Sequence, residues 1–238
     1  MATDAISNDP VQVLPVELHP VVDHLVTEDD TPVDNVFSEK QMRLLTEPLY
    51  SSWTAPSGQR SFVAMSNVGL FFDVHRPPLV PDALLSTNVV RPAEFRAKRH
   101  RSYFIWEYGK PPDVVIEIVS NREGGEDTEK LETYAEIGVR YYAIFDPDRL
   151  LSPELLRVYR LLEGEYGKMD EPIRFPKLGI GLRIWQGTFE SWDTAWLRWV
   201  DAEGTPVPTG RESAESERQR ADHLAEQLRQ LGVEPPEA

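Results

Sequence analysis

Val114-Val115-Ile116-Glu117-Ile118-Val119 is the strongest strand signal in the chain, an almost unbroken β-branched run interrupted by one carboxylate. Runs of this type are typical of strands that are buried on both faces of a sheet. An ionised carboxylate in such a strand is costly unless a cation or strong hydrogen-bond donors meet it. Three interpretations of Glu117 follow: a buried ion pair with an arginine such as Arg140 or Arg157, an edge position open to water, or metal ligation at the rim of the sheet.

The segment after this strand indicates a helix and a second strand. A polar turn at 121–125 precedes a helix that Asp127 or Thr128 can cap and that Gly138 can end. An apolar strand at 141–146 follows. Strand, helix and strand within about 33 residues predict a right-handed βαβ unit.

Three charged residues near this unit have alternative interpretations. Lys130 shares a helix face with Tyr134, four residues later, and either pairs with Glu126 at the surface or faces the sheet with a chemical role. Asp82 precedes a short apolar run, so it lies at the mouth of a strand or in an ordinary turn. Asp113 heads the central strand, where a capping or edge role is expected.

The rest of the chain predicts further elements with less marked patterns. A helix is expected at about 36–49. The runs 61–67 and 68–74 predict two strands of a hairpin with a tight turn at 67–69. Further strands are expected at 155–162 and 178–185.

Composition limits both the class of protein and the type of metal site. The 238 residues, 40% of them hydrophobic, suit one well-buried domain with polar tails. There are no cysteines, and the five scattered histidines show no ligand spacing, so carboxylates must be the main ligands of any metal. No run of about 20 apolar residues and no signal peptide is present, so we expect no membrane partner and a cytoplasmic location.

Charge is distributed unevenly along the chain, whose formal net charge is −15. The stretch 1–33 is an acidic arm that we expect to be only partly ordered. The stretch 91–110 contains six basic and two acidic residues with interleaved aromatic side chains. It predicts either a patch that binds DNA phosphates or a solvated loop. The candidate DNA-binding residues in it are Arg96, Lys98, Arg99 and Arg101.

The C-terminal segment is different in kind from the rest. A linker at 201–210 precedes a helical, coiled-coil-like tail at 211–238. Its apolar residues fall on the a and d positions of a short heptad pattern, namely Ala214, Ala221, Leu224, Leu228 and Leu231. Because fewer than three heptads make a solitary coiled coil marginal, the tail either docks on the domain or pairs in a homodimer.

The block from Lys110 to Asp148 closely resembles the core of the Uma-type restriction endonuclease family, a bacterial branch of the PD-(D/E)XK nuclease superfamily. Members show an upstream Pro-Asp, a strand V-x-E-[IV]-x-S, a helix with lysine ahead of L-x-x-Y-A-x-x-G-V, and a strand ending in Asp-Pro. The matching residues here are Pro81-Asp82, Val115 to Ser120, Lys130, Leu131, Tyr134, Ala135, Gly138, Val139 and Asp146-Pro147. The resemblance extends over about 34–199, and the tail is also like that of many relatives.

This resemblance implies an α/β (α+β) fold, with a restriction-endonuclease-like mixed central sheet flanked by helices, over residues 34–200. It implies that Asp82 and Glu117 bind Mg²⁺, or alternatively Mn²⁺, with the Ile118 carbonyl as a third ligand. It also implies that Lys130 supplies a positive charge from the helix.

Two departures from the superfamily pattern stand out. The usual lysine position, two residues after the glutamate, is Val119. This is similar to the family's relocation of the lysine to the next helix. Where relatives often show a glutamate and a histidine in the first helix, this chain has Asp34 and Ser38. Asp34 can still join the site as a carboxylate, whereas Ser38 cannot replace an imidazole.

The leading hypothesis is therefore a metal-dependent endonuclease that hydrolyses DNA phosphodiester bonds. The main alternative is a catalytically inactive nuclease-fold module for binding or assembly, with the C-terminal helix as its contact surface. The acidic arm suits that alternative, or it lies over the basic patch and restrains it. A nucleotide-binding enzyme is disfavoured because no glycine-rich phosphate loop follows a predicted strand.

Overall fold

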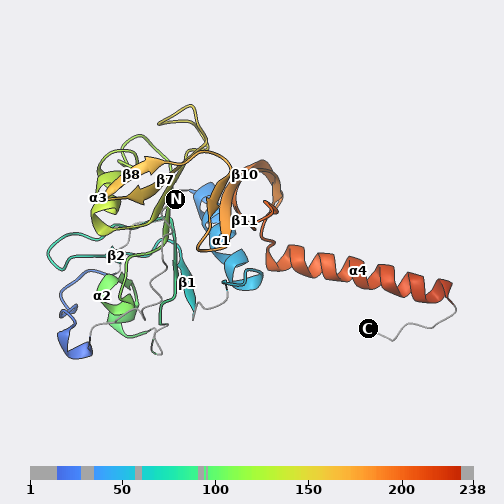
Figure 1. Ribbon diagram of the computed structural model, residues 1–238, viewed down its shortest axis with the longest axis horizontal. Helices are drawn as coiled ribbons and strands as arrows, with labels where there is room; N and C mark the ends of the chain where they lie inside the picture. The colour runs from blue at the N-terminus through green and yellow to red at the C-terminus, as the bar shows by residue number, and fades with distance from the viewer. Residues whose placement is uncertain (1–14, 28–34, 57–60, 91–93, 95, 232–238) are drawn as a thin grey trace.

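The computed structural model describes residues 15–27, 35–56, 61–90, 94 and 96–231. A central sheet, a second sheet and a short two-stranded pair form the body, and one long helix extends away from it (Figure 1). The helices are α1 (Val36–Ser51), α2 (Ile105–Tyr108), α3 (Glu129–Ile137) and α4 (Gly210–Gln230), with 3-10 turns η1 (Val16–Leu18) and η2 (Lys98–His100).

The central sheet is mixed, as the sequence predicts. Its strands lie in the order β1 (Phe62–Met65), β3 (Ala83–Thr87), β5 (Val114–Ile118), β6 (Tyr141–Phe145), β7 (Leu156–Leu162) and β8 (Glu165–Lys168). Only β5 and β6 run parallel among these pairs, and α3 connects them, so the predicted βαβ unit is confirmed. Gly138 ends α3 in the left-handed conformation with φ of 88°, which a residue without a Cβ adopts at little cost.

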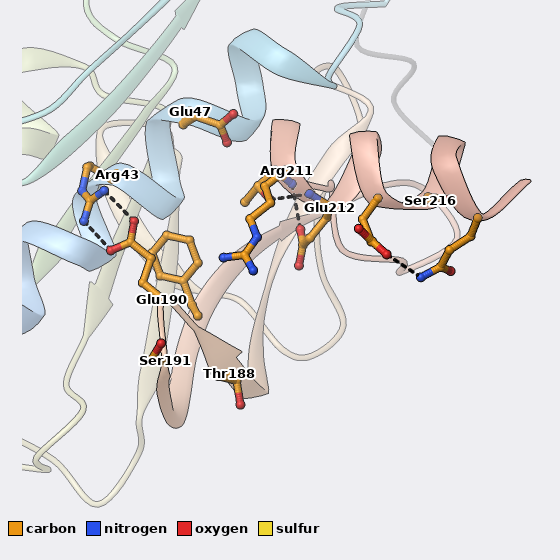
Figure 2. A pocket seen from close by; sticks show the side chains of 12 residues that line it. Arg43, Glu47, Thr188, Glu190, Ser191, Arg211, Glu212 and Ser216 are labelled. Carbon is orange, nitrogen blue, oxygen red and sulfur yellow. Dashed lines mark hydrogen bonds and ion pairs between the residues drawn. The ribbon is translucent and has the colours of Figure 1, made fainter. Parts of the chain in front are cut away.

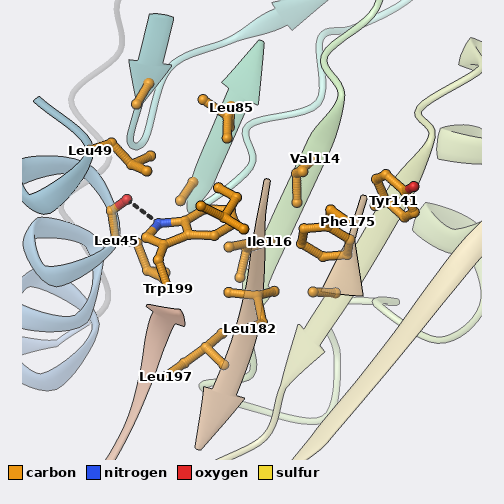
Figure 3. Packing of buried hydrophobic residues seen from close by; sticks show 14 of the residues in the cluster. Leu45, Leu49, Leu85, Val114, Ile116, Tyr141, Phe175, Leu182, Leu197 and Trp199 are labelled. Carbon is orange, nitrogen blue, oxygen red and sulfur yellow. Dashed lines mark hydrogen bonds between the residues drawn. The ribbon is translucent and has the colours of Figure 1, made fainter. Parts of the chain in front are cut away.

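A second, three-stranded antiparallel sheet covers one face of the central sheet. It consists of β9 (Ile173–Phe175), β10 (Ile180–Phe189) and β11 (Trp192–Val200), with β10 in the middle. Side chains from both sheets and from α1 interdigitate in one core around Ile116, Leu182 and Trp199 (Figure 3). The Trp199 indole donates a hydrogen bond of 2.7 Å to the Leu45 carbonyl, which joins β11 to α1.

The opposite face of the central sheet packs against α3 and the segment around α2. Its core includes Val115, Tyr134, Tyr142 and Ile144, all fully buried. Because side chains alternate along a strand, Val115 and Glu117 point to this face while Ile116 and Ile118 point to the other. The strand that the sequence indicates as buried on both faces is therefore so, with the carboxylate on the α3 side.

A strand lies in each of the two predicted runs, 61–67 and 68–74, but the two strands do not pair with each other as a hairpin. β1 pairs with β3, whereas β2 (Leu70–Phe71) pairs in parallel with β4 (Tyr103–Phe104). The turn contains Asn67, whose φ is 52°. The N–H of Asn67 donates hydrogen bonds to residues outside the turn, the carbonyls of Pro81 and Asp82. Since β3 takes the antiparallel position beside β1, the chain after Gly69 leaves the central sheet.

Helix α1 agrees closely with the predicted helix at 36–49. Asn35 caps it by accepting a hydrogen bond of 2.9 Å from the Ser38 N–H. The predicted strands at 155–162 and 178–185 are confirmed as β7 and the first part of β10. No helix within the described ranges has the length and apolar character needed to cross a membrane.

Candidate active site

Glu117 is a buried carboxylate near the end of β5, with only 1% of its surface exposed. Its side chain enters the apolar layer between the central sheet and α3. The water-exposed edge position is therefore excluded for this residue. The negative charge of Glu117 must therefore be compensated by neighbouring side chains or by a cation.

Two side chains of α3 meet the two oxygens of Glu117. The Tyr134 hydroxyl donates to Oε1 at 2.6 Å, and Lys130 Nζ donates to Oε2 at 3.0 Å. Both reach the same carboxylate because residues four apart lie on one face of a helix. The shared helix face that the sequence predicts for Lys130 and Tyr134 is thus the face that contacts Glu117.

Asp82, the residue immediately before β3, also belongs to this cluster. The antiparallel register places Ala83 opposite Ile116, so continuing it by one residue places Asp82 opposite Glu117. The carboxylate of Asp82 accepts a hydrogen bond of 2.7 Å from the Ile118 N–H. Its negative charge is close enough to Glu117 to raise the pKa of that residue.

The electrostatics of the cluster move the pKa of Glu117 close to neutral pH. Burial raises the pKa of Glu117 from 4.5 to about 7, although the Lys130 charge and the Tyr134 hydrogen bond oppose this. Burial lowers the pKa of Lys130, but the charges of Glu117 and Glu126 outweigh it and raise that pKa above 10.5. Lys130 therefore stays a cation, and Glu117 is poised to gain or lose a proton.

The arginine interpretation of Glu117 is wrong, because its cationic partner is Lys130. Arg157 pairs instead with Asp127, with 3.1 Å between Nη1 and Oδ2. The register across β5, β6 and β7 does place Arg157 on the same row of the sheet as Glu117, with Ile144 between them. Because β6, with the apolar Ile144, lies between β5 and β7, the charges of Glu117 and Arg157 do not come into contact.

Glu126 is a fourth charged member of the cluster, which the sequence indicates only as a surface partner of Lys130. Its Oε1 lies 3.4 Å from Lys130 Nζ, so the surface pair considered for Lys130 exists in addition to the pair with Glu117. The pair is not at the surface, because Glu126 is only 6% exposed. Its Oε2 is buried without a hydrogen-bond partner. A glutamate four residues before a helical lysine is so ordinary that no signal in the sequence marks this burial.

The other predicted site residues lie apart from this cluster or outside the described ranges. Asp34 lies outside them. Asp113 has the structural role expected of it, since its Oδ2 accepts hydrogen bonds from the Thr87 N–H and from Lys110 Nζ. Ile118 contributes its N–H to Asp82, and the register directs its side chain away from Glu117.

The basic segment contacts the N-terminal part of the chain. Lys98 Nζ donates to the Asp23 carbonyl at 2.6 Å, and Arg101 Nε donates to the Arg96 carbonyl at 3.0 Å. Nearby, His19 pairs with Glu107 at 2.9 Å. Residues 15–27 thus pack beside the basic segment, the arrangement considered for the acidic arm. The sequence offers this placement only as one of two alternatives, because no periodic pattern marks the arm.

A pocket of about 640 Å³ lies elsewhere, between α1, the β10–β11 turn and the first turns of α4 (Figure 2). Its charges are largely paired: Glu190 binds Arg43, and Glu212 binds Arg198. None of the site residues predicted from the sequence lines this pocket. The chemistry-bearing cluster is therefore the one around Glu117.

The donor set of the cluster fits a hard divalent cation. Among the described residues, no three histidine, cysteine or acidic side chains converge as a complete protein-made metal centre. Mg²⁺ is usually held by one or two carboxylates together with waters and substrate phosphates, which Asp82 and Glu117 can satisfy.

A mixed sheet flanked by helices, with facing carboxylates on adjacent strands and a lysine on the crossover helix, defines a restriction-endonuclease-like domain. A family model described as Uma2, putative restriction endonuclease, matches residues 30–172. Since this match covers more than half of the chain, the chain belongs to the Uma2 family. No curated protein matches the chain significantly.

Proposed function

We propose that this chain is a metal-dependent endodeoxyribonuclease that hydrolyses phosphodiester bonds at the cluster of Asp82, Glu117 and Lys130. The observation that carries the proposal is the 3.0 Å contact between Lys130 Nζ and the buried carboxylate of Glu117, beside Asp82. A buried ion pair contributes little stability compared with apolar side chains of similar volume. Its presence in an otherwise apolar layer favours a chemical role, and the family supports a nuclease.

Each residue of the cluster has a distinct role in this proposal. Asp82 and Glu117 would hold Mg²⁺ or Mn²⁺, with the Ile118 carbonyl as a third ligand. When bound, such an ion lowers the pKa of a bound water and polarises a phosphoryl oxygen. Lys130 offsets the negative charge that develops on the phosphate, and Tyr134 holds the Glu117 carboxylate in place.

DNA would be held through its phosphates by the basic segment. Arg96 and Arg99 are exposed, so both can reach a ligand. Lys98 and Arg101 complete the proposed patch. Asp34 is proposed as an additional carboxylate of the active site. Because phosphate contacts carry no sequence information, these residues would supply affinity and orientation.

Self-association through α4 is a further part of the proposal. The helix is anchored at its start by the capping box of Thr209 and Glu212 and by the Arg198–Glu212 pair. Further along it exposes apolar side chains: Leu224 is 50% exposed and Leu231 is 78% exposed. These residues lie on the heptad positions that would face a second copy of the chain.

A plasmid-nicking assay at low salt, with Mg²⁺ or Mn²⁺, tests the nuclease proposal. Low salt is chosen because electrostatic binding to DNA is strongest there. We expect cutting by the wild-type protein, loss of cutting in Glu117→Gln and in the presence of a chelator, and full retention in Glu129→Gln. Glu129 is the matched control because it is an exposed glutamate in the first turn of α3.

The alternative is a nuclease-fold module that binds or assembles without cutting. The projection of α4 away from the body favours it, because that helix offers a contact surface outside the body (Figure 1). Folded wild-type protein that cuts no form of DNA with either metal would establish this alternative and refute the nuclease.

A further inference from the structure

We propose that Glu126 is a positioning residue. When a divalent cation binds at Glu117, the ammonium group of Lys130 moves from Glu117 to Glu126. This inference rests on the metal site of the proposed function, and it assigns a role to a residue that the sequence indicates only as a surface partner of Lys130. Glu126 acts through Lys130 and does not itself bind the metal.

The first support is that two carboxylates share one ammonium group. Lys130 Nζ lies 3.0 Å from Oε2 of Glu117 and 3.4 Å from Oε1 of Glu126. A small rotation of the long lysine side chain is enough to exchange the nearer partner for the other. The two contacts thus define two positions for the same positive charge.

The second support is that Glu126 is held in place by features outside the ion pair. The Tyr142 hydroxyl donates to its backbone carbonyl at 2.8 Å. Its carboxylate occupies the space that a side chain at position 124 would fill, because a Cβ on Gly124 would come within 2.0 Å of Oε1. The carboxylate is therefore seated in a defined place beside α3.

The third support is the free-energy cost of burying the Glu126 carboxylate. The Glu126 side chain is only 8% exposed, and Oε2 is buried without a hydrogen-bond partner. A buried carboxylate oxygen without a hydrogen-bond partner is destabilising, and a state of the site that supplies a donor removes this cost. A lysine that moves toward Glu126 can donate to both oxygens, since an ammonium group has three donors.

With all its carboxylates ionised, the cluster carries the charge that a divalent cation would balance. Asp82, Glu117 and Glu126 carry three negative charges when ionised, and Lys130 carries one positive charge. The two remaining negative charges are what one divalent cation neutralises. A cation on Glu117 repels the ammonium of Lys130, and Glu126 provides the counter-charge that keeps this ammonium in the site.

The test is a double-mutant cycle on the affinity for Mn²⁺, measured by calorimetry on the full chain without DNA. The variants are Glu126→Gln, Lys130→Met and the double variant, with Glu129→Gln as the matched control. In the presence of Lys130, we expect Glu126→Gln to weaken Mn²⁺ binding about tenfold, the size typical of residues that support metal ligands. In the Lys130→Met background the same change should have less than about a threefold effect, because no ammonium needs a second partner.

Gly124→Ala provides a second, independent perturbation, since it displaces the Glu126 carboxylate without removing its charge. It should weaken Mn²⁺ binding like Glu126→Gln, and Glu129→Gln should leave it unchanged. Unfolding curves of all variants establish that each is folded.

Equal losses from Glu126→Gln with and without Lys130 would overturn the proposal, because Glu126 would then act as a ligand itself. An unchanged affinity in Glu126→Gln would also overturn it, as would a wild-type protein that binds no Mn²⁺. The expected coupling in a protein that cuts no DNA would support this inference while refuting the nuclease function.

Discussion

Glu117 shows how one residue on a buried strand acquires unusual chemistry. The apolar layer raises its pKa, whereas Lys130 and Tyr134 stabilise its charged form. Because the first effect is larger, the folded protein without metal binds a proton on Glu117 more tightly than the unfolded chain does. This difference has consequences for stability and for metal binding.

The stability of the metal-free protein should fall with pH because of Glu117. Since its pKa rises from 4.5 to about 7 on folding, the stabilising contribution is fully present below 4.5 and is lost as pH rises through about 7. Between about pH 5 and about pH 8, the free energy of unfolding should fall more for wild type than for Glu117→Gln, as measured by denaturant unfolding. Equal falls in both proteins would contradict the raised pKa.

Tyr134→Phe should destabilise the protein more than a similar change elsewhere. It leaves the buried Glu117 Oε1 without its 2.6 Å donor, which costs about 1.5–3 kcal/mol for a bond to a charged group at about pH 8. The control is Tyr166→Phe, which loses a 2.8 Å bond to the neutral Val139 carbonyl and should cost about 0.5–1.5 kcal/mol. Urea unfolding measures both, and an equal cost would argue that Glu117 is neutral at that pH.

The residues of the site could be predicted from the sequence only in part. Glu117 stands out because it interrupts an apolar strand, and Lys130 and Tyr134 share a helix face by spacing alone. The partner of Glu117 could not be chosen among basic residues, because the choice depends on the tertiary position of α3 over the sheet. Glu126 was considered only as a surface partner of Lys130, because the burial of its carboxylate depends on the fold around Gly124.

At the scale of elements, the strand–helix–strand unit is the part that local patterns determine best. β5 and β6 are apolar runs, and Gly138 ends the helix between them. The hairpin at 61–74 failed because strand pairing is a non-local choice, and β3 competes successfully for β1. The short strands β4 and β9 were missed because two or three residues carry no detectable period.

Gln41 joins α1 to the second sheet, and its loss should be costly. Its amide accepts from the Leu197 N–H at 2.9 Å and donates to the Leu197 carbonyl at 2.8 Å, entirely within the core. Gln41→Leu leaves both backbone groups unpaired and should lower the free energy of unfolding by about 2–4 kcal/mol. The same change at Gln219, exposed on α4, should have an effect below about 0.5 kcal/mol. A small effect at Gln41 would show that α1 is not fixed to β11 through this bond.

At the scale of the whole molecule, the body and the projecting part of α4 should behave independently. The first turn of α4 contacts the body through Glu47, whose carboxylate accepts from the Gly210 N–H, and through the Ser52–Ser213 contact. Truncation after Ser216 keeps these contacts and should change the free energy of unfolding by less than about 0.5 kcal/mol. A larger loss would mean that the projecting part of α4 supports the body.

The same truncation tests self-association through α4. Light scattering should find a dimer for the full chain and a monomer for the truncated one, because the exposed leucines Leu224 and Leu231 are removed. A monomeric full chain, or a truncated chain that still dimerises, would refute pairing through this helix.

The most direct test of the central claim, a metal site at Glu117, is an anomalous-scattering map from crystals containing Mn²⁺. We expect one peak at about 2.1 Å from a carboxylate oxygen of Asp82 and of Glu117, the distance typical of hard divalent ions. Lys130 should then lie closer to Glu126 than to Glu117. A peak at another place, or none while Lys130 still contacts Glu117, would contradict the account.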